Sequence, residues 1–263
     1  MTSSGTAPAY RRLSVDQRRT QLIAAALGLF AQHRPEHVSL DGVAAEAGVS
    51  RPLVYRYFPG GKQQLYEAAL RSAADELEQC FHEPRTGPLT LRLRRALDRY
   101  LAFVDEHDAG FTALLRGGSV VSTSRTDAIV DEVRRVAAEQ ILLHLDLTGA
   151  ADVAPDGAQE DGRHAERAGA RLRLTVRTWI TAVEAASLIW LDEGKQPPLG
   201  ELRDWLVDVF VAQLTTTAAR DEHTARTVEH ALRLEQPDGP VGDLARRALP
   251  VADAAARLLG GES

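Results

Sequence analysis

The chain has 263 residues, of which 44% are apolar and 26% charged; these are ordinary values for a globular protein with a substantial core. A single cysteine, Cys80, excludes an intramolecular disulfide and a cysteine-based zinc site. The first residues lack the apolar core of a signal peptide, and no apolar segment reaches the ~20 residues of a membrane-spanning helix. We therefore expect a soluble, cytoplasmic protein with no membrane partner.

The formal charge of −6 is unevenly distributed along the chain. Residues 1–72 hold nine basic and five acidic side chains, a net charge of +4, while the remaining residues carry −10. A basic N-terminal part on an acidic body indicates a protein that presents one end to nucleic acid.

The N-terminal residues predict an arm followed by a helix. Residues 1–13 are expected to be flexible, and Arg11 and Arg12 would either contact DNA or form a solvated charge pair. Ser14 and Gln17 have the spacing of a capping box. Apolar residues at helical spacing follow, so the sequence predicts a helix over about 15–33.

Residues 39–58 predict two short helices joined by a turn. Ser39 is a good N-cap for the first helix, and Gly48 is suited to the left-handed conformation just after its end. Ser50 caps the second helix, with Pro52 in its first turn. This spacing and turn chemistry are typical of a helix-turn-helix.

The second of these helices separates an apolar side from a polar, aromatic one. Val54 and Phe58 are four residues apart and can pack on the rest of the domain. The other side chains then face outward, and two arginines with two tyrosines suit a DNA-reading helix. These outward residues are Arg51, Leu53, Tyr55, Arg56 and Tyr57.

The segment from about residue 18 to residue 70 resembles the DNA-binding region of the TetR family of bacterial transcriptional regulators. A Tyr-x-Tyr-Phe run followed by a lysine is the most specific part of the match. The matching residues are Ser39, Val43, Ala44, Ala47, Gly48, Val49, Ser50, Tyr55, Tyr57, Phe58, Lys62 and Leu65.

We assign the predicted DNA contacts by side-chain chemistry. Arg51 can bind a guanine edge through two hydrogen bonds, and Leu53 either contacts a thymine methyl group or packs inside the domain. The remaining candidates suit phosphate oxygens, with Lys62 aided by the N-terminus of the helix that follows. They are Ser39, Ser50, Tyr55, Arg56, Tyr57 and Lys62.

The rest of the chain reads as helices. We expect an all-α protein with an N-terminal three-helix helix-turn-helix domain and a larger helical ligand-binding and dimerisation domain. The expected bounds are 1–13 for the arm, 14–72 for the DNA-binding domain, 73–219 for the second domain, and 220–263 for an extension of a helix plus a tail. Residues 148–164 are rich in Gly, Ala and Asp and are expected to be a mobile loop.

Residues 179–191 are apolar on nearly all sides, and such a helix must be covered on two faces. Paired with residues 202–214, they would form half of a four-helix bundle that a second copy completes. The resemblance implies the same homodimer. The contact candidates are Ala182, Ala185, Ala186, Ile189, Leu206, Phe210 and Gln213.

The resemblance also implies a pocket for a small-molecule effector in the second domain. Its wall candidates are aromatic residues, a histidine and an acid that stands within an apolar segment. That acid, Glu184, could bind a cationic ligand, pair with an arginine such as Arg177, or lie at a wet edge of the dimer. The full set is Tyr100, Phe103, His107, Phe111, Trp179 and Glu184.

The chain shows no Gly-rich phosphate loop, no nucleophile elbow and no paired histidine ligands on a helix. We therefore expect no enzymatic activity, no cofactor and no metal. The sequence favours a ligand-responsive regulator, by default a repressor released from a palindromic double-stranded DNA operator by a small molecule, with activation left open. The alternative is a ligand-binding helical dimer without sequence-specific DNA binding.

Overall fold

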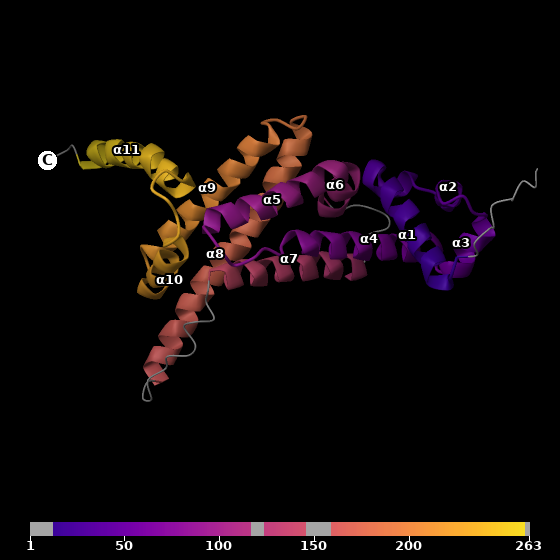
Figure 1. Ribbon diagram of the computed structural model, residues 1–263, viewed down its shortest axis with the longest axis horizontal. Coiled ribbons are helices and arrows are strands. Elements are labelled where there is room, and N and C mark those ends of the chain that lie inside the picture. The colour runs from indigo at the N-terminus through magenta and orange to yellow at the C-terminus, as the bar shows by residue number, and fades with distance from the viewer. Residues whose placement is uncertain (1–12, 117–123, 146–158, 261–263) are drawn as a thin grey trace, which may run out of the picture. The chain divides into compact units, whose positions relative to one another are not determined.

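The computed structural model describes residues 13–116, 124–145 and 159–260, and every element in these ranges is helical (Figure 1). The predicted all-α fold is confirmed. The helices are α1 (Val15–Gln32), a 3₁₀ turn η1 (Pro35–His37), α2 (Leu40–Glu46), α3 (Arg51–Tyr57), α4 (Gly61–Cys80), α5 (Leu89–Glu106), α6 (Asp108–Arg116), α7 (Ser124–His144), α8 (Gln159–Asp192), α9 (Leu199–Ala218), α10 (Glu222–Leu232) and α11 (Pro240–Gly260).

The chain forms two compact units. The first comprises residues 1–73 and 107–127, and the second comprises residues 74–106 and the chain from Ala128 onward. Residues 107–127, which the sequence analysis placed in the second domain, therefore group with the N-terminal helices. No helix in the described parts of the chain is long and apolar enough to cross a membrane.

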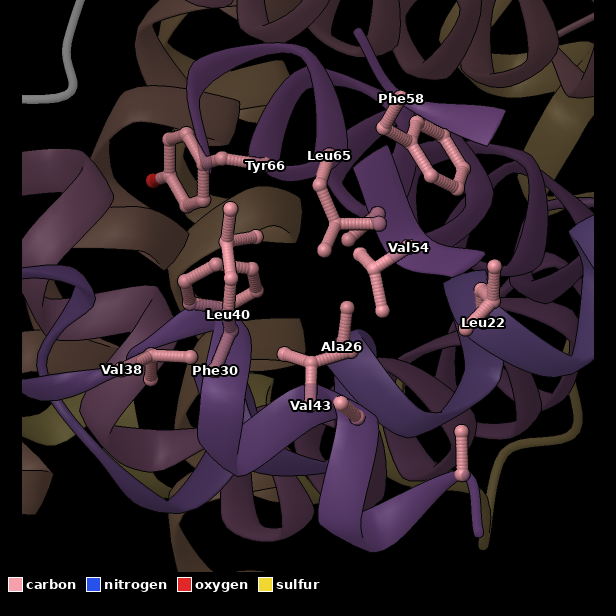
Figure 2. Close-up of a cluster of buried hydrophobic side chains, with 13 residues drawn as sticks. Leu22, Ala26, Phe30, Val38, Leu40, Val43, Val54, Phe58, Leu65 and Tyr66 are labelled. Atoms are coloured by element: carbon pink, nitrogen blue, oxygen red, sulfur yellow. The ribbon is translucent and has the colours of Figure 1, made fainter. Parts of the chain in front are cut away.

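The first unit is built around one apolar cluster (Figure 2). Phe30 from α1 meets Tyr66 from α4 edge-on, with ring centroids 4.9 Å apart. The capping box that starts α1 is present, because the Ser14 hydroxyl accepts the Gln17 N–H and the Gln17 side chain accepts the Ser14 N–H. The fully or nearly fully buried members of the apolar cluster include Leu22, Ala26, Val43, Val54, Phe58, Leu65 and Ala69.

Helix α6 packs closely on the C-terminal part of α1 within this first unit. A Cβ atom added to Gly110 would lie 2.7 Å from the carbonyl oxygen of Phe30. Only glycine permits this approach without a shift of backbone, so Gly110 sets the distance between the two helices.

The second unit is organised on α9, which contacts α5, α8, α10 and α11. Leu206, Phe210 and Leu214 of α9 are fully buried. Their spacing of four residues places them on one side of the helix, which forms the centre of this unit's core.

Two sequence-based expectations differ from the structure in the second unit. Of the expected loop over 148–164, residues 148–158 lie outside the described ranges, and residues 159–164 belong to α8, which begins at Gln159. The expected C-terminal tail contains the helix α11. Arg247 of this helix binds Asp208 of α9 at 2.7 Å.

Candidate functional site

The turn between α2 and α3 has the geometry that the sequence predicts. The Ser39 hydroxyl accepts the Gly42 N–H at 3.0 Å and caps α2. Gly48 has φ +62°, the left-handed conformation, and the Val49 N–H then donates to the Ala44 carbonyl at 2.8 Å. This reversal of the chain sets the direction of α3 relative to α2.

Helix α3 is fixed by its apolar side. Val54 and Phe58 have no exposed surface and lie in the core of the first unit (Figure 2). The guanidinium of Arg19 from α1 lies 5.1 Å from the centre of the Phe58 ring and adds a cation–π contact. The opposite side, with Arg51, Tyr55 and Arg56, faces solvent.

Arg51 is held in place by two neighbours at the exposed start of α3. Its Nη1 donates to the Asp41 carboxylate of α2 at 2.9 Å, and its guanidinium carbon lies 5.6 Å from the centre of the Tyr55 ring. The Tyr55 side chain and, to a smaller extent, the charge of Asp41 raise the pKa of Arg51. The result is a charged, pre-oriented guanidinium that a guanine edge or phosphate can engage.

The phosphate candidates occupy different surroundings. Lys62 donates to the Glu36 carbonyl oxygen at 3.1 Å, in the first turn of α4. Ser50 is exposed and makes no side-chain cap bond, and no described residue binds the Arg56 side chain. Leu53 and Tyr57 are half-buried, and Tyr57 packs on the apolar cluster. Their DNA contacts remain predictions.

Two residues outside the predicted set support this surface. The Asp41 carboxylate orients Arg51. Gln21 of α1 donates to the Ala47 carbonyl at the end of α2, at 2.9 Å. An acid ten residues before an arginine gives no periodic signal, so only the fold could reveal the first pair.

The predicted wall of the effector pocket is divided between the two units. His107 and Phe111 belong to the first unit, and Tyr100, Phe103, Trp179 and Glu184 to the second. All five residues other than Glu184 are buried, and burial raises the pKa of Tyr100.

Trp179 is a packing residue of the second unit rather than a side chain facing an open pocket. It is 4% exposed, its indole N–H donates to the Leu206 carbonyl at 2.9 Å, and its ring centre lies 4.6 Å from that of Phe210. An effector could reach this ring only after the core had rearranged.

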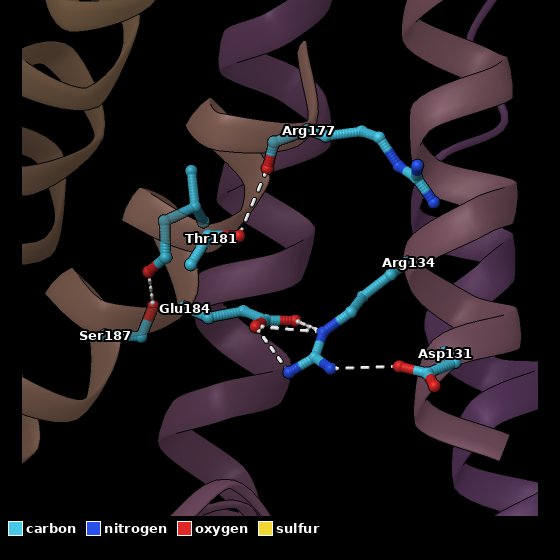
Figure 3. Close-up of polar contacts among 7 residues, drawn as sticks. Asp131, Arg134, Arg177, Thr181, Glu184 and Ser187 are labelled. Carbon is cyan, nitrogen blue, oxygen red and sulfur yellow. Dashed lines mark hydrogen bonds and ion pairs between the residues drawn. The ribbon is translucent and has the colours of Figure 1, made fainter. Parts of the chain in front are cut away.

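Of the alternatives weighed for Glu184, pairing with an arginine is the one in the structure, but the partner is Arg134 and not the suggested Arg177. Its carboxylate accepts from Arg134 Nε at 3.0 and 3.1 Å and from Arg134 Nη2 at 2.9 Å (Figure 3). Arg134 also binds Asp131 at 3.1 Å. This network joins α7 to α8 and neutralises the acid inside the apolar segment.

The dimer candidates require one correction. Leu206 and Phe210 are fully buried in the protomer's own core, so their side chains offer no surface to a second copy. Both helical faces are apolar in the sequence, and periodicity could not separate the inner face of α9 from the outer one. The exposed apolar residue beside them is Trp205, at 54%.

The α8 candidates lie where a partner could reach them. Ile189 is 61% exposed, Ala185 is exposed, and Ala182 and Ala186 are half-buried. Gln213 of α9 is half-buried as well.

Two family descriptions match the chain. Residues 22–69 match "Bacterial regulatory proteins, tetR family", and residues 89–213 match "Tetracyclin repressor-like, C-terminal domain". The first match contains α2 and α3 with all the outward residues of α3, and the second runs from α5 into α9.

The curated relatives that the chain matches are transcriptional regulators. The HTH-type transcriptional activator FasR of Mycolicibacterium smegmatis is 28% identical over 137 residues, which cover 47% of this chain and 62% of FasR. The transcriptional regulator HbdR of an Aromatoleum strain is 36% identical over 94 residues, 35% of this chain and 40% of HbdR. The matched segments thus span roughly half the length of these curated relatives.

Solved structures agree over a larger part of the chain. A tetR-family transcriptional regulator from Streptomyces coelicolor is 46% identical, with a TM-score of 0.79, and the match covers 92% of this chain and 100% of that one. FadR of Bacillus subtilis, solved with stearoyl-CoA, shares the fold at 13% identity, with a TM-score of 0.55 and coverage of 74% and 98%. The chain belongs to the TetR family of helix-turn-helix, DNA-binding transcriptional regulators.

Proposed function

We propose that this protein is a cytoplasmic, ligand-responsive repressor that binds a palindromic operator as a homodimer and releases it when a small molecule binds. The surface of α3 carries the proposal. Arg51, Tyr55 and Arg56 face solvent together, while buried Val54 and Phe58 fix the helix that presents them. A basic, aromatic helix surface held rigidly is suited to the major groove.

The homodimer is supported by the outer faces of α8 and α9. These two helices contact each other within the second unit. Ala185 and Ile189 of α8 are exposed, as are Trp205 and Ala212 of α9. Exposed apolar residues on two adjacent helices are typical of an interface between copies.

Release by a ligand is supported by how the chain connects the two units. It passes between them within α4, between α5 and α6, and within α7. A ligand that binds one arrangement of the second unit more tightly would bias the first unit through these continuous segments. The loss in DNA affinity then equals the coupling free energy between the two sites.

The first experiment is selection of duplexes from a randomised pool at moderate salt. The wild type is expected to enrich a twofold-symmetric site, and Arg51→Ala to lose preference at one position of each half-site. Arg71→Ala is the matched control, because Arg71 is an exposed arginine of the same unit, on α4. Binding without enrichment would contradict the operator, and absence of binding would leave the alternative of a ligand-binding dimer.

The dimer is tested by sedimentation of Ile189→Glu and Trp205→Glu. Both substitutions place a charge in the proposed interface and are expected to yield monomers that bind operator DNA weakly. Leu249→Glu on α11 is the control, since Leu249 is equally exposed at 60%. If only the control variant Leu249→Glu were monomeric, the interface would lie on α11 instead.

A further inference from the structure

The second unit contains a basic cavity that the predicted effector wall does not include. Its volume is about 230 Å³, just below the ~300 Å³ at which pockets for larger organic ligands begin. Arg85 and Arg92, before and in the first turn of α5, line it together with His144 at the end of α7 and His230 near the end of α10. Leu143 and Leu234 add apolar surface.

Arg92 lines this cavity, and its guanidinium is only partly hydrogen-bonded. The residue is 7% exposed, and its Nη1 donates to His144 Nδ1 at 2.9 Å and to the His144 carbonyl at 3.3 Å. Its Nε is buried without a partner, and no described residue accepts a hydrogen bond from Nη2. A guanidinium can bind a carboxylate or phosphate through parallel hydrogen bonds from two of its N–H groups.

The hydrogen bond from Arg92 also fixes the protonation of His144. A guanidinium only donates, so Nδ1 must accept and the ring proton resides on Nε2. His144 therefore offers a second N–H donor among the groups that line the cavity. Burial, then the charges of Arg92 and Arg85, lowers the pKa of His144.

No carboxylate lines the cavity to neutralise these groups. The acid whose charge acts on Arg92 is Glu235, and its two oxygens accept from the Thr90 N–H at 2.8 Å and the Thr90 hydroxyl at 2.7 Å. No described residue forms an ion pair with Arg85 or Arg92, so the positive charge lacks a counterion from the described protein.

We propose that this cavity binds a small oxyanion, the carboxylate or phosphate group of a small molecule, against the guanidinium of Arg92 with Arg85 and His144 as further partners. The site includes His230 and Ala231 of α10, a helix that lies beyond the matched residues 89–213. Binding here does not rest on DNA recognition.

The test is calorimetric titration of the full chain with inorganic phosphate and, separately, with butyrate, in chloride buffer. We expect saturable binding of at least one of them. Removing one charged partner should weaken binding by roughly tenfold or more, because the free energy of a hydrogen bond to a charged group is at least that of a tenfold change in affinity. Phosphate alone would assign a phosphate ester, butyrate alone a carboxylic acid, and both a general oxyanion site.

The variants separate the site from general charge effects. Arg85→Gln removes an exposed cavity residue without a partner in the described protein, so the fold is retained, and Arg92→Gln removes the buried guanidinium. Arg95→Gln is the matched control, since Arg95 is exposed on the same helix and does not line the cavity. Equal binding by all four proteins, or no saturable binding of either anion by the wild type, would overturn the proposal.

A second readout follows His144 itself by NMR. A bound anion offsets the charges of Arg85 and Arg92, so the pKa of His144 is expected to rise when the anion that binds is added. The charge of Glu83 raises the pKa of His144 already in the absence of the anion. The rise should disappear in Arg85→Gln or be markedly smaller. An unchanged His144 titration at saturating anion would place the bound anion elsewhere and refute the site.

Discussion

Replacing Glu184 with glutamine tests how the acid in the apolar segment of α8 is tolerated. The substitution keeps the size of the side chain but removes the charge that accepts three hydrogen bonds from Arg134 (Figure 3). The glutamine amide N–H₂ would also face guanidinium N–H groups, which cannot accept its hydrogens. We expect the second unit to be destabilised.

The burial of the two partners sets the magnitude. Glu184 is 17% exposed and Arg134 41%. Hydrogen bonds to charged groups contribute about 1.5–3 kcal/mol, and we expect a loss in this range. It should stay below the ~3–5 kcal/mol of a fully buried pair, because Arg134 remains partly in water and keeps its bond to Asp131.

The assay is urea unfolding at one fixed protein concentration, arranged as a double-mutant cycle of Glu184→Gln with Arg134→Met. The control cycle uses Arg135 and Glu139 on the exposed side of α7, where both partners are about half exposed. Such exposed pairs contribute about 0.3–0.5 kcal/mol. A coupling energy for Glu184 and Arg134 no larger than the control would refute the reasoning.

Three further predictions address the first unit. Gly110→Ala should lower the stability of the first unit by about 1–3 kcal/mol, because the added Cβ atom would meet backbone. Gly28→Ala, where the space is open, should raise the stability by about 0.5–1 kcal/mol. Thermal unfolding of both variants measures these changes, and equal effects would contradict the close approach at Gly110. Burial raises the pKa of Tyr66 from 10.0 to about 12, so above pH 10 this tyrosine loses its proton in the unfolded chain before it does in the folded one. The free energy of unfolding should therefore fall by about 1 kcal/mol between pH 10 and 11. Urea titrations should show that Tyr66→Phe lacks this share of the fall, and identical pH profiles of the two proteins would refute the prediction. Asp41→Asn removes the carboxylate that orients Arg51 and should weaken operator binding by up to about fivefold. Fluorescence anisotropy measures the affinity, and tighter binding would mean that the ion pair competes with DNA for the guanidinium.

The sequence by itself determined the elements whose causes lie within a few residues. The capping box at Ser14, the cap at Ser39 and the left-handed Gly48 are local features, and each occurs as the sequence predicts. The buried side of α3 followed from the spacing of Val54 and Phe58. A short-range pattern specifies both the helix-turn-helix and the family to which the chain belongs.

The tertiary structure decided every feature that depends on distant parts of the chain. Periodicity marked α8 and α9 as apolar, but only packing shows that Phe210 faces inward and Trp205 outward. Glu184 finds its partner fifty residues away on α7, and Arg92 meets His144 across fifty-two. Such pairs leave no periodic signal, because their neighbours are set by how helices pack and not by where residues stand along one helix.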